Sequence, residues 1–268
     1  MLIILAVKEN TGKEDMTMNI TTGLHPYTRL GHMEALEGAI MTERRLDVAA
    51  NNLANADTPG FRKQGITFEE YMLQEQDGSN RTAKGEVIWQ DMSAGSVHFT
   101  ENQWDFAING EGFFSVQTPA GIRYTRAGNF MLDSQGQLIT QDGYPVLGGG
   151  APIILEDTTG KYITLSPDGH FFVDETDAGQ IDVVTFDNPE FLQRMGRNYF
   201  SETPAAGAPR PVEDVNIAQG YLELSNVNEL EDMINLIDLH RAYELQQKSL
   251  QAVDHMDDKA ANTVGRVA

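Results

Sequence analysis

The chain contains side chains that could catalyse a reaction or bind a metal, but none has the spacing that such chemistry needs. No HExxH or comparable ligand pair is formed by the histidines, which are His25, His32, His98, His170, His240 and His255. No GxSxG segment would place a serine nucleophile on a sharp turn. The absence of cysteine removes disulfides, thiolate metal sites and cysteine nucleophiles. The sequence therefore predicts no enzyme, no cofactor and no metal site.

Two further patterns begin like ligand-binding loops and are not completed. Gly110 and Gly112 start a phosphate-loop pattern, but no GxGxxG follows and no Lys-Ser or Lys-Thr comes after them. The acidic residues Asp174, Glu175 and Asp177 lack the spacing of a calcium loop. We expect a hairpin turn at the first place and a solvent-exposed loop at the second.

The most specific polar pattern is a group of asparagines at the end of an expected helix. The amides of Asn51, Asn52 and Asn55 can bond backbone or partner groups that an apolar residue would leave unsatisfied. Before them, small or apolar residues spaced four and three apart form a narrow seam: Ala35, Ala39, Thr42, Leu46, Ala49 and Leu53. Such a seam can contact a helix of the same chain or of another chain.

A turn is expected directly after this helix. Pro59 disfavours the helical conformation at Thr58, and Pro59-Gly60 suits the centre of a type II turn. The chain should therefore reverse before Phe61. An ordinary helix that ends in a turn would explain the same residues.

A second helix is expected near the other end of the chain. It has apolar side chains on more than one face, at Leu230, Met233, Ile234, Leu236, Ile237 and Leu239. A seam runs from Met233 through Leu236, Tyr243, Leu250 and Val253. Ser225 is the expected cap, with Asn228 as its rival. The two terminal helices could pack on each other inside a monomer or on neighbouring chains, and spacing alone does not decide between these arrangements.

Short β-type runs separated by turn signals fill the middle of the chain. Strands are expected at 104–108, 113–118, 122–125, 130–132, 138–140, 153–155, 163–165, 171–173 and 182–186. The dipeptides Asn109-Gly110, Asp142-Gly143 and Asp168-Gly169 should make hairpin turns, residues 148–150 a hinge, and residues 203–211 a loop. Frequent short strands predict antiparallel β-structure.

These observations predict an α+β protein with a discontinuous layout. Helices from the two ends form a coiled-coil-like domain around a central, mainly antiparallel β domain. The expected segments are a leader (1–19), an N-terminal helical assembly segment (20–60), a connecting segment (61–84), a central β domain (85–215) and a C-terminal helical assembly segment (216–268). The true start could also be Met16 or Met18.

The formal net charge of −21 argues against nucleic acid as a partner, because binding to phosphates needs clustered Lys and Arg. Between residues 213 and 258, eleven carboxylates accompany only Arg241 and Lys248. We therefore expect Arg44 and Arg45 to face carboxylates of a C-terminal helix, in the same or a neighbouring subunit. No apolar run is long enough to predict insertion into a membrane.

Three ordered motifs resemble the bacterial flagellar rod and hook protein family. They are ANNLANADTPGF at 50–61, the stretch at 105–148 that begins DFAINGEGFF, and the stretch at 220–254 that begins GYLELSNVNELEDMINLIDLHRAYELQQKS. The resemblance is greatest to proximal rod proteins, with distal rod proteins second. It implies a structural subunit that is exported by the flagellar type III apparatus and that associates with itself and with other rod and hook subunits. It would form the axial drive shaft between motor and hook, where the rod spans the periplasm.

By the same resemblance, assembly residues are expected at both ends of the chain. They are Leu46, Asn51, Asn52, Leu53, Asn55, Pro59, Gly60 and Phe61 at one end, and Asn226, Val227, Leu230, Ile234, Arg241 and Tyr243 at the other. Packing within the subunit is the alternative role for these residues. The alternative function is a β-rich adhesin or carbohydrate-binding module displayed by helical oligomerisation.

Overall fold

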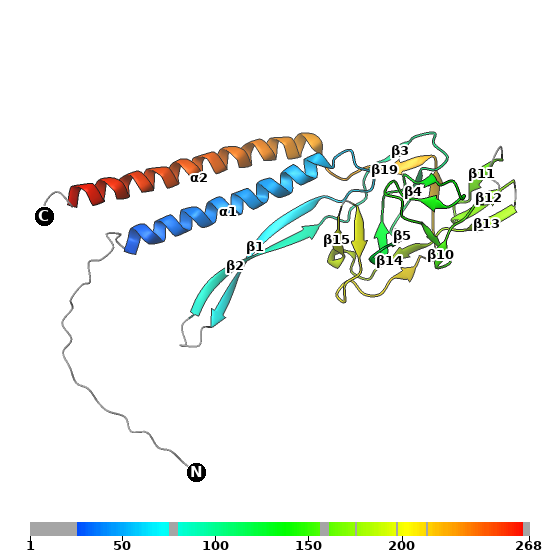
Figure 1. Ribbon diagram of the computed structural model, residues 1–268, viewed down its shortest axis with the longest axis horizontal. Helices are drawn as coiled ribbons and strands as arrows, with labels where there is room; N and C mark the ends of the chain where they lie inside the picture. Colours follow the sequence, from blue (N-terminus) through cyan, green and yellow to red (C-terminus); the bar gives the residue numbers. More distant parts are fainter. Residues whose placement is uncertain are drawn as a thin grey trace, which may run out of the picture. The chain divides into compact units, whose positions relative to one another are not determined.

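The computed structural model describes residues 26–74, 80–155, 161–174, 176–196, 198–212 and 214–264. The protein is α+β, with helix α1 (Pro26–Ala54) before a β-rich region and helix α2 (Glu229–Val264) after it (Figure 1). The backbone forms two units, one holding α1 up to Ala39 with α2 from Leu245, and one running from Ile40 to Glu244. The expected leader and the alternative starts lie outside the described residues.

The expected seam of α1 lies on the covered side of that helix. Ala39, Thr42 and Ala49 are buried, and Ala35, Leu46 and Leu53 are half-buried. In the first unit Gly38 of α1 lies against Gln246 of α2, because a Cβ atom on Gly38 would be 3.3 Å from the Gln246 side chain. Gly38, next to the seam residue Ala39, thus allows the two helices to approach closely there.

Helix α2 differs from expectation at its start. Asn228 Oδ1 accepts the N–H of Glu231 at 3.3 Å, so Asn228 caps the helix. Ser225 instead accepts the N–H of Val227 at 3.2 Å. The seam also begins one residue earlier than expected, since Met233 is 48% exposed while Asp232 is buried. Buried and half-buried positions then recur with spacings of three and four: Asp232, Leu236, Leu239, Tyr243, Gln246, Leu250 and Val253.

A long antiparallel hairpin follows α1. It pairs β1 (Gln64–Gln74) with β2 (Asn80–Gln90), with Gly65 opposite Trp89 and Ile66 opposite Ile88. The segment 61–84, expected only to connect, therefore holds a whole strand, and the expected boundary at residue 85 falls inside β2. Alternation of Ile66 and Phe68 with polar residues is the signal of a half-exposed strand.

The largest sheet has six antiparallel strands in the order β15-β16-β6-β5-β14-β17. Their bounds are Gln193–Met195 (β15), Tyr199–Ser201 (β16), Gly121–Thr125 (β6), Phe113–Thr118 (β5), Val183–Thr185 (β14) and Arg210–Pro211 (β17). A 3-10 helix (Pro189–Phe191) precedes β15. The last strand lies in the segment 203–211, where a loop was expected.

Smaller antiparallel sheets complete the β-rich region. One joins β11 (Ile163–Leu165), β12 (His170–Val173) and β13 (Thr176–Gln180). Four strand pairs are β3 (Val97–Phe99) with β19 (Tyr221–Glu223), β4 (Phe106–Ile108) with β18 (Ile217–Gln219), β7 (Met131–Leu132) with β8 (Leu138–Ile139), and β9 (Leu147–Gly148) with β10 (Ala151–Pro152). The β-structure therefore continues past residue 216, where the helical segment was expected to begin.

The expected turns are partly confirmed. Asp142-Gly143 and Asp168-Gly169 reverse the chain between paired strands, with φ of 82° at Gly143 and 87° at Gly169. Asn109-Gly110 does not make a hairpin, because the strands on either side of it, β4 and β5, belong to different sheets. Of the expected strands, 104–108 begins only at Phe106, and 153–155 is reduced to a bridge from Ile154 to Gln137.

Gly149 and Gly150, where a hinge was expected, form the turn between β9 and β10. The carboxylate of Asp182 accepts the N–H groups of Gly149 and Gly150 at 2.8 and 2.9 Å. These charge-assisted bonds tie the turn to the segment just before β14.

Aromatic clusters make up much of the core of the β-rich region. In the larger one, Phe106 packs on Phe130 and Phe171, with ring centroids 6.1 and 5.6 Å apart. In the second, Phe113 packs on Phe186 and Phe200 at 6.1 and 5.7 Å. Full burial of one such side chain stabilises the fold by about 1.5–3 kcal/mol. These clusters fix the framework that carries the polar residues described next.

Candidate functional site: a polar junction where the helices meet the β-structure

Asn52, in the last turn of α1, binds the backbone of the first residue of β1. Its Oδ1 accepts the N–H of Gln64 at 2.9 Å, and its Nδ2 donates to the carbonyl of Gln64 at 2.8 Å. The side chain is almost completely buried, at 2% exposure. Asn52 therefore satisfies backbone groups that would otherwise be unpaired.

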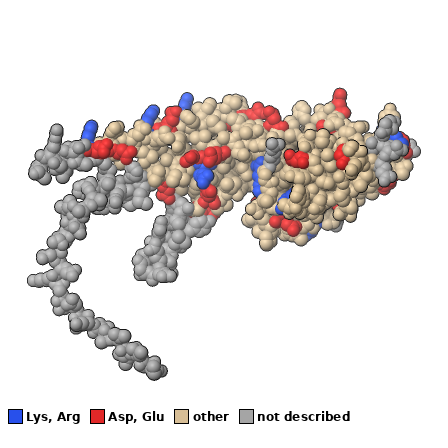
Figure 2. All heavy atoms as spheres, viewed as in Figure 1, with Lys and Arg blue, Asp and Glu red and all other residues tan. Residues whose placement is uncertain are grey.

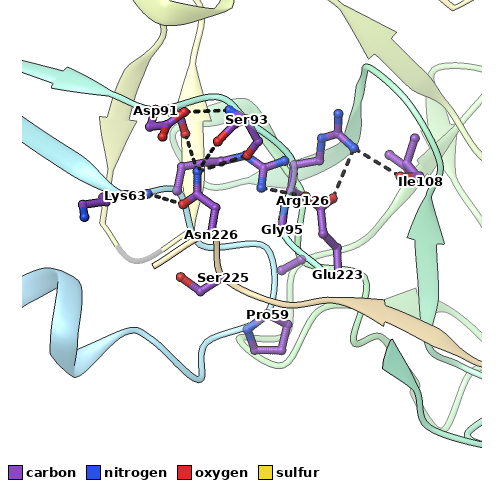
Figure 3. Close-up of polar contacts among 12 residues, drawn as sticks. Pro59, Lys63, Asp91, Ser93, Gly95, Ile108, Arg126, Glu223, Ser225 and Asn226 are labelled. Carbon is purple, nitrogen blue, oxygen red and sulfur yellow. Dashed lines mark hydrogen bonds and ion pairs between the residues drawn. The ribbon is translucent and has the colours of Figure 1, made fainter. Parts of the chain in front are cut away.

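Asn226, in the segment before α2, binds the neighbouring residue of the same strand entrance (Figure 3). Its Oδ1 accepts the N–H of Lys63 at 2.7 Å, while its Nδ2 donates to the carbonyls of Asp91 and Ser93 at 3.0 and 3.1 Å. The carbonyl of Lys63 accepts the N–H of Asp91 at 2.9 Å. One amide thus joins the entrance of β1, the exit of β2 and the approach to α2.

A buried carboxylate between two arginines lies beside these amides. Oε1 of Glu223 is 2.6 Å from Nη1 of Arg62, and Oε2 is 3.2 Å from Nη1 of Arg126. Side-chain exposures are 1% for Arg62, 2% for Glu223 and 6% for Arg126. Oε1 also accepts the N–H of Gly95 at 2.9 Å. Charges at this depth persist only when they are paired, so Glu223 holds both guanidinium groups in place.

Arg126 extends this ionic group into the β-rich region. Its Nη2 donates to the carbonyl of Gly110 at 2.6 Å, and its guanidinium carbon lies 5.4 Å from the ring centre of Phe113. Burial lowers the pKa of Arg126 to about 10, and the charge of Glu223 opposes that shift. Arg126 therefore stays protonated at neutral pH.

The turn after α1 is hydrogen-bonded to the backbone of Glu223, the buried carboxylate residue. The N–H of Phe61 donates to the carbonyl of Thr58 at 3.2 Å and Gly60 has φ of 66°, which confirms the expected type II turn. The N–H of Gly60 donates to the carbonyl of Glu223 at 2.8 Å. A Cβ atom on Gly60 would lie 2.4 Å from the carbonyl carbon of Arg126, so only glycine allows this approach.

Other contacts anchor the two sides of this turn. Asn198 donates from Nδ2 to the carbonyl of Pro59 at 2.8 Å. Phe61 is 1% exposed, and the guanidinium carbon of Arg194 lies 4.2 Å from its ring centre. Burial lowers the pKa of Arg194 to about 10.

Lys63 connects the junction to α2. Its Nζ lies 2.8 Å from Oδ1 of Asp232, whose side chain is 3% exposed. Arg44 and Arg45, the basic residues expected to face α2, have other partners within the chain. Arg44 lies 3.4 Å from Glu86 of β2, and Arg45 lies over the ring of Phe68 at 5.5 Å.

The structure separates the expected assembly residues into three groups by their burial. Asn52, Gly60 and Phe61 are buried, and Leu46, Leu53, Asn55, Pro59, Asn226, Val227 and Tyr243 are half-buried. Asn51, Leu230, Ile234 and Arg241 are exposed. Asn55 donates from Nδ2 to the carbonyl of Asn51 at 2.8 Å, which closes the end of the helix. The buried members have contacts inside this chain, whereas the exposed ones present free surface.

The charged residues of the junction were absent from the sequence analysis. Glu223 was detectable as a lone carboxylate between Leu222 and Leu224, but nothing in the sequence indicated that Arg62 and Arg126 would meet it. Residues 62 and 223 lie far apart in the chain and approach only when the strands pair. The junction contains oppositely charged pairs and backbone bonds, which suits it to fixing geometry.

Other kinds of site were sought among the described residues. No group of three or more His, Asp or Glu side chains there is placed to hold a metal ion. No helix in the described part of the chain is long and apolar enough to cross a membrane. On the face shown in Figure 2, acidic side chains are scattered over the surface, in keeping with the net charge.

Comparison with known proteins places three family matches along the chain. Residues 34–62 match the flagella basal body rod protein family, residues 107–173 the flagellar hook protein FlgE/F/G D1 domain, and residues 218–263 the flagellar basal body rod FlgEFG protein C-terminal family. The polar junction draws residues from all three matches, with Asn52 and Arg62 in the first, Arg126 in the second and Glu223 in the last.

Full-length relatives agree with these matches. The chain is 37% identical to the flagellar basal-body rod protein FlgF of Mesorhizobium japonicum, over 86% of this chain and 96% of the relative. It is 36% identical to FlgG of Buchnera aphidicola subsp. Schizaphis graminum (80% and 92%) and 35% identical to FlgF of Caulobacter vibrioides (85% and 95%). With its three family segments in order and relatives that match along nearly their whole length, the chain belongs to the flagellar basal-body rod protein family.

Proposed function

We propose that this protein is a structural subunit of the bacterial flagellar basal-body rod, which polymerises through its terminal helices into the axial shaft between motor and hook. Family membership supports the rod as its place of action, and the relatives are named rod proteins. These names do not support the alternative of an adhesin or carbohydrate-binding module. Relatives named FlgF and FlgG match at nearly equal identity, and we propose the proximal rod as its position.

The observation that supports polymerisation is an apolar face of α2 that the rest of the described chain leaves exposed. Leu230 is 70% exposed, Ile234 54% and Ile237 45%, and these residues lie on the side of the helix opposite Asp232, Leu236 and Leu239. With a period of 3.6 residues, the two sets fall on opposite sides of one helix. A contiguous exposed apolar face on a soluble subunit marks an interaction surface.

The coiled-coil character of the terminal helices belongs to this proposal. The covered residues of α1 and α2 recur with alternating spacings of four and three, which is the heptad pattern of helix pairs. We infer that residues 20–60 and 216–268 supply the assembly segments and that the β domain (85–215) lies outside the shaft. The partners are other copies and other rod and hook-family subunits, after export by the flagellar type III apparatus from the cytoplasm to the periplasm.

Complementation of a deletion strain tests this function. Deletion of the gene should abolish motility. Electron microscopy of basal bodies should show that the rod ends before the position that this subunit occupies. The wild-type gene should restore both, and Ile234→Glu should not, because a charge would interrupt the apolar face. Ser249→Glu, at an exposed polar position of α2, is the matched control. Intact rods in the deletion strain would refute the proposal.

A further inference from the structure

An open groove of about 670 Å³ lies at the start of α2. Its walls are residues 56–57 of the turn after α1, residues 93–96 and residues 224–230. Asn226 fixes the groove, because its Nδ2 donates to the carbonyl oxygen and to Oγ of Ser93, both at 3.1 Å (Figure 3). Segments that lie far apart in the sequence therefore build one defined surface.

The charged side chains of this groove are acidic. Asp57 and Glu229 line it, both are exposed, and neither has a hydrogen bond or ion pair within the described chain. None of its described lining residues is Lys, Arg or His. The half positive charge at the N-terminus of α2 offsets only part of these two negative charges. Because half-buried Val227 and exposed Leu230 add apolar surface, the groove fits a cationic side chain that is carried on an apolar face.

The chain itself contains a side chain of this kind. Among the Lys and Arg side chains that the structure describes, only Arg241 and Lys248 have no hydrogen bond, ion pair or ring contact. Arg241 is exposed and comes four residues after Ile237 and seven after Ile234. Such spacings place residues on one side of a helix. The guanidinium of Arg241 therefore extends from the exposed apolar face of α2.

The groove of the same chain cannot receive Arg241. Arg241 comes twelve residues after Glu229 in one continuous helix, so their backbones are about 18 Å apart at a rise of 1.5 Å per residue. This distance exceeds the reach of an arginine side chain. Nearby on α2, Glu244 pairs with His240 at 3.4 Å, and in the described chain no ion pair joins Arg241 to Asp238. A carboxylate partner for Arg241 therefore has to come from another molecule.

We propose that the groove of one copy binds Arg241 of a second copy. The guanidinium pairs with Asp57 and Glu229, and Ile237 of the second copy packs on Leu230. A guanidinium presents five N–H donors in one plane, which suits it to bind more than one carboxylate oxygen. The contact rests on the proposed rod function and specifies one interface within it. Because the groove and Arg241 are different surfaces, each copy keeps one of each free, so the contact repeats without closing.

Carbodiimide cross-linking of assembled rods tests this contact. The reagent joins a lysine amine to a carboxylate where the two touch, and arginine does not react. Basal bodies that carry Arg241→Lys should therefore yield a peptide pair that joins position 241 to Asp57 or Glu229, as mass spectrometry would identify. Wild-type basal bodies should lack this pair. Lys248 is the matched control, since it is exposed on the same helix and also lacks a partner in the described chain.

Three cross-linking results would overturn the proposal. The first is the absence of any pair from position 241 in assembled Arg241→Lys rods. The second is a pair that joins position 241 to a carboxylate outside the groove or to a different rod protein. The third is a pair that joins Lys248 to Asp57 or Glu229. Each of these results leaves the rod function standing if the deletion strain lacks rods.

Charge exchange gives a second readout that does not depend on cross-linking. Arg241→Glu should reduce motility at least tenfold, because it places a carboxylate against Asp57 and Glu229. Adding Asp57→Arg and Glu229→Gln in the same chain should restore most of that loss, since every copy then carries both altered surfaces. Lys248→Glu should leave motility near that of the wild type.

All four positions are exposed, so the purified variants should melt at the temperature of the wild type. Normal motility of the Arg241→Glu strain would contradict the contact. Failure of the two groove substitutions to restore motility would contradict it as well.

Discussion

Asn52 and Asn226 bind the backbones of two consecutive residues, Gln64 and Lys63, from opposite ends of the chain. One amide belongs to the first helix and the other to the segment before the second. Each accepts a backbone N–H at the entrance of β1, at 2.9 and 2.7 Å, and donates to other carbonyls. These bonds set where the helical ends join the β-structure, so substitutions there should alter stability.

Replacing Asn52 by alanine should cost about 1–3 kcal/mol of unfolding free energy, because the N–H and carbonyl of Gln64 lose their partners in a buried place. Asn51→Ala is the matched control, since Asn51 is exposed and should change stability by less than about 0.5 kcal/mol. Urea unfolding followed by circular dichroism measures both. Equal effects of the two substitutions would contradict the role assigned to Asn52.

Glu223→Gln should destabilise the protein more strongly, by about 3–5 kcal/mol, because two buried guanidinium groups lose their counter-charge. The variant keeps the size of the side chain and removes only its charge. Glu190→Gln, at an exposed position, should have little effect. A Glu223→Gln protein as stable as the wild type in urea would show that Arg62 and Arg126 need no buried carboxylate.

Gly60→Ala should destabilise more than Gly143→Ala, although both glycines have positive φ, of 66° and 82°. Comparing the two variants separates the cost of the steric clash from the cost of the positive φ. A Cβ atom at Gly60 meets the backbone of Arg126 and Ala127, whereas nothing lies within 4 Å at Gly143. We expect at least 1 kcal/mol for the backbone conformation at either site. Thermal unfolding should give a lower melting temperature for Gly60→Ala than for Gly143→Ala. Similar melting temperatures for the two variants would refute the role of the close approach at Gly60.

Asp91 gives a prediction for acid stability. The N–H of Ser93 donates to its carboxylate at 2.9 Å and lowers the pKa of Asp91 below 3.8. A lowered folded-state pKa contributes stability that is present above pH 3.8 and is lost as pH falls through the folded-state value. Asp91→Asn should therefore be less stable than the wild type at pH 6, with the difference vanishing in stronger acid. A constant difference from pH 6 to pH 2 in urea titrations would contradict this.

Limited proteolysis of the dilute monomer tests the domain boundaries, which stay a prediction. Helices whose apolar faces lack a partner subunit are only marginally stable, so the protease should cleave the N-terminal and C-terminal helices first. The expected fragment 85–215 would lose β18 and β19, which pair with β4 and β3, so the fragment that survives should extend to residue 223 or beyond, as its mass would show. Equal resistance along the whole chain would indicate that the helices pair fully within one subunit.

The sequence by itself determined those features that depend on local patterning. The type II turn at Pro59-Gly60 follows from the fixed φ of proline and the freedom of glycine. Helical periodicity identified the seam from Ala35 to Leu53, and residue alternation with turn signals identified an antiparallel β-rich middle. The family resemblance rested on contiguous motifs and was confirmed by the comparisons.

Only the tertiary structure decided which distant residues meet. Spacing could not show that Glu223 lies between Arg62 and Arg126, because loop closure over long stretches leaves no local signal in sequence. The tertiary structure likewise decides that the Asn52 amide bonds to the Gln64 backbone inside the chain, while Leu230 and Ile234 stay on the surface. A group of asparagines in the sequence indicates only that amide donors and acceptors are available. Which groups they bind is decided by the folded chain, whose geometry depends on the packing of the whole core.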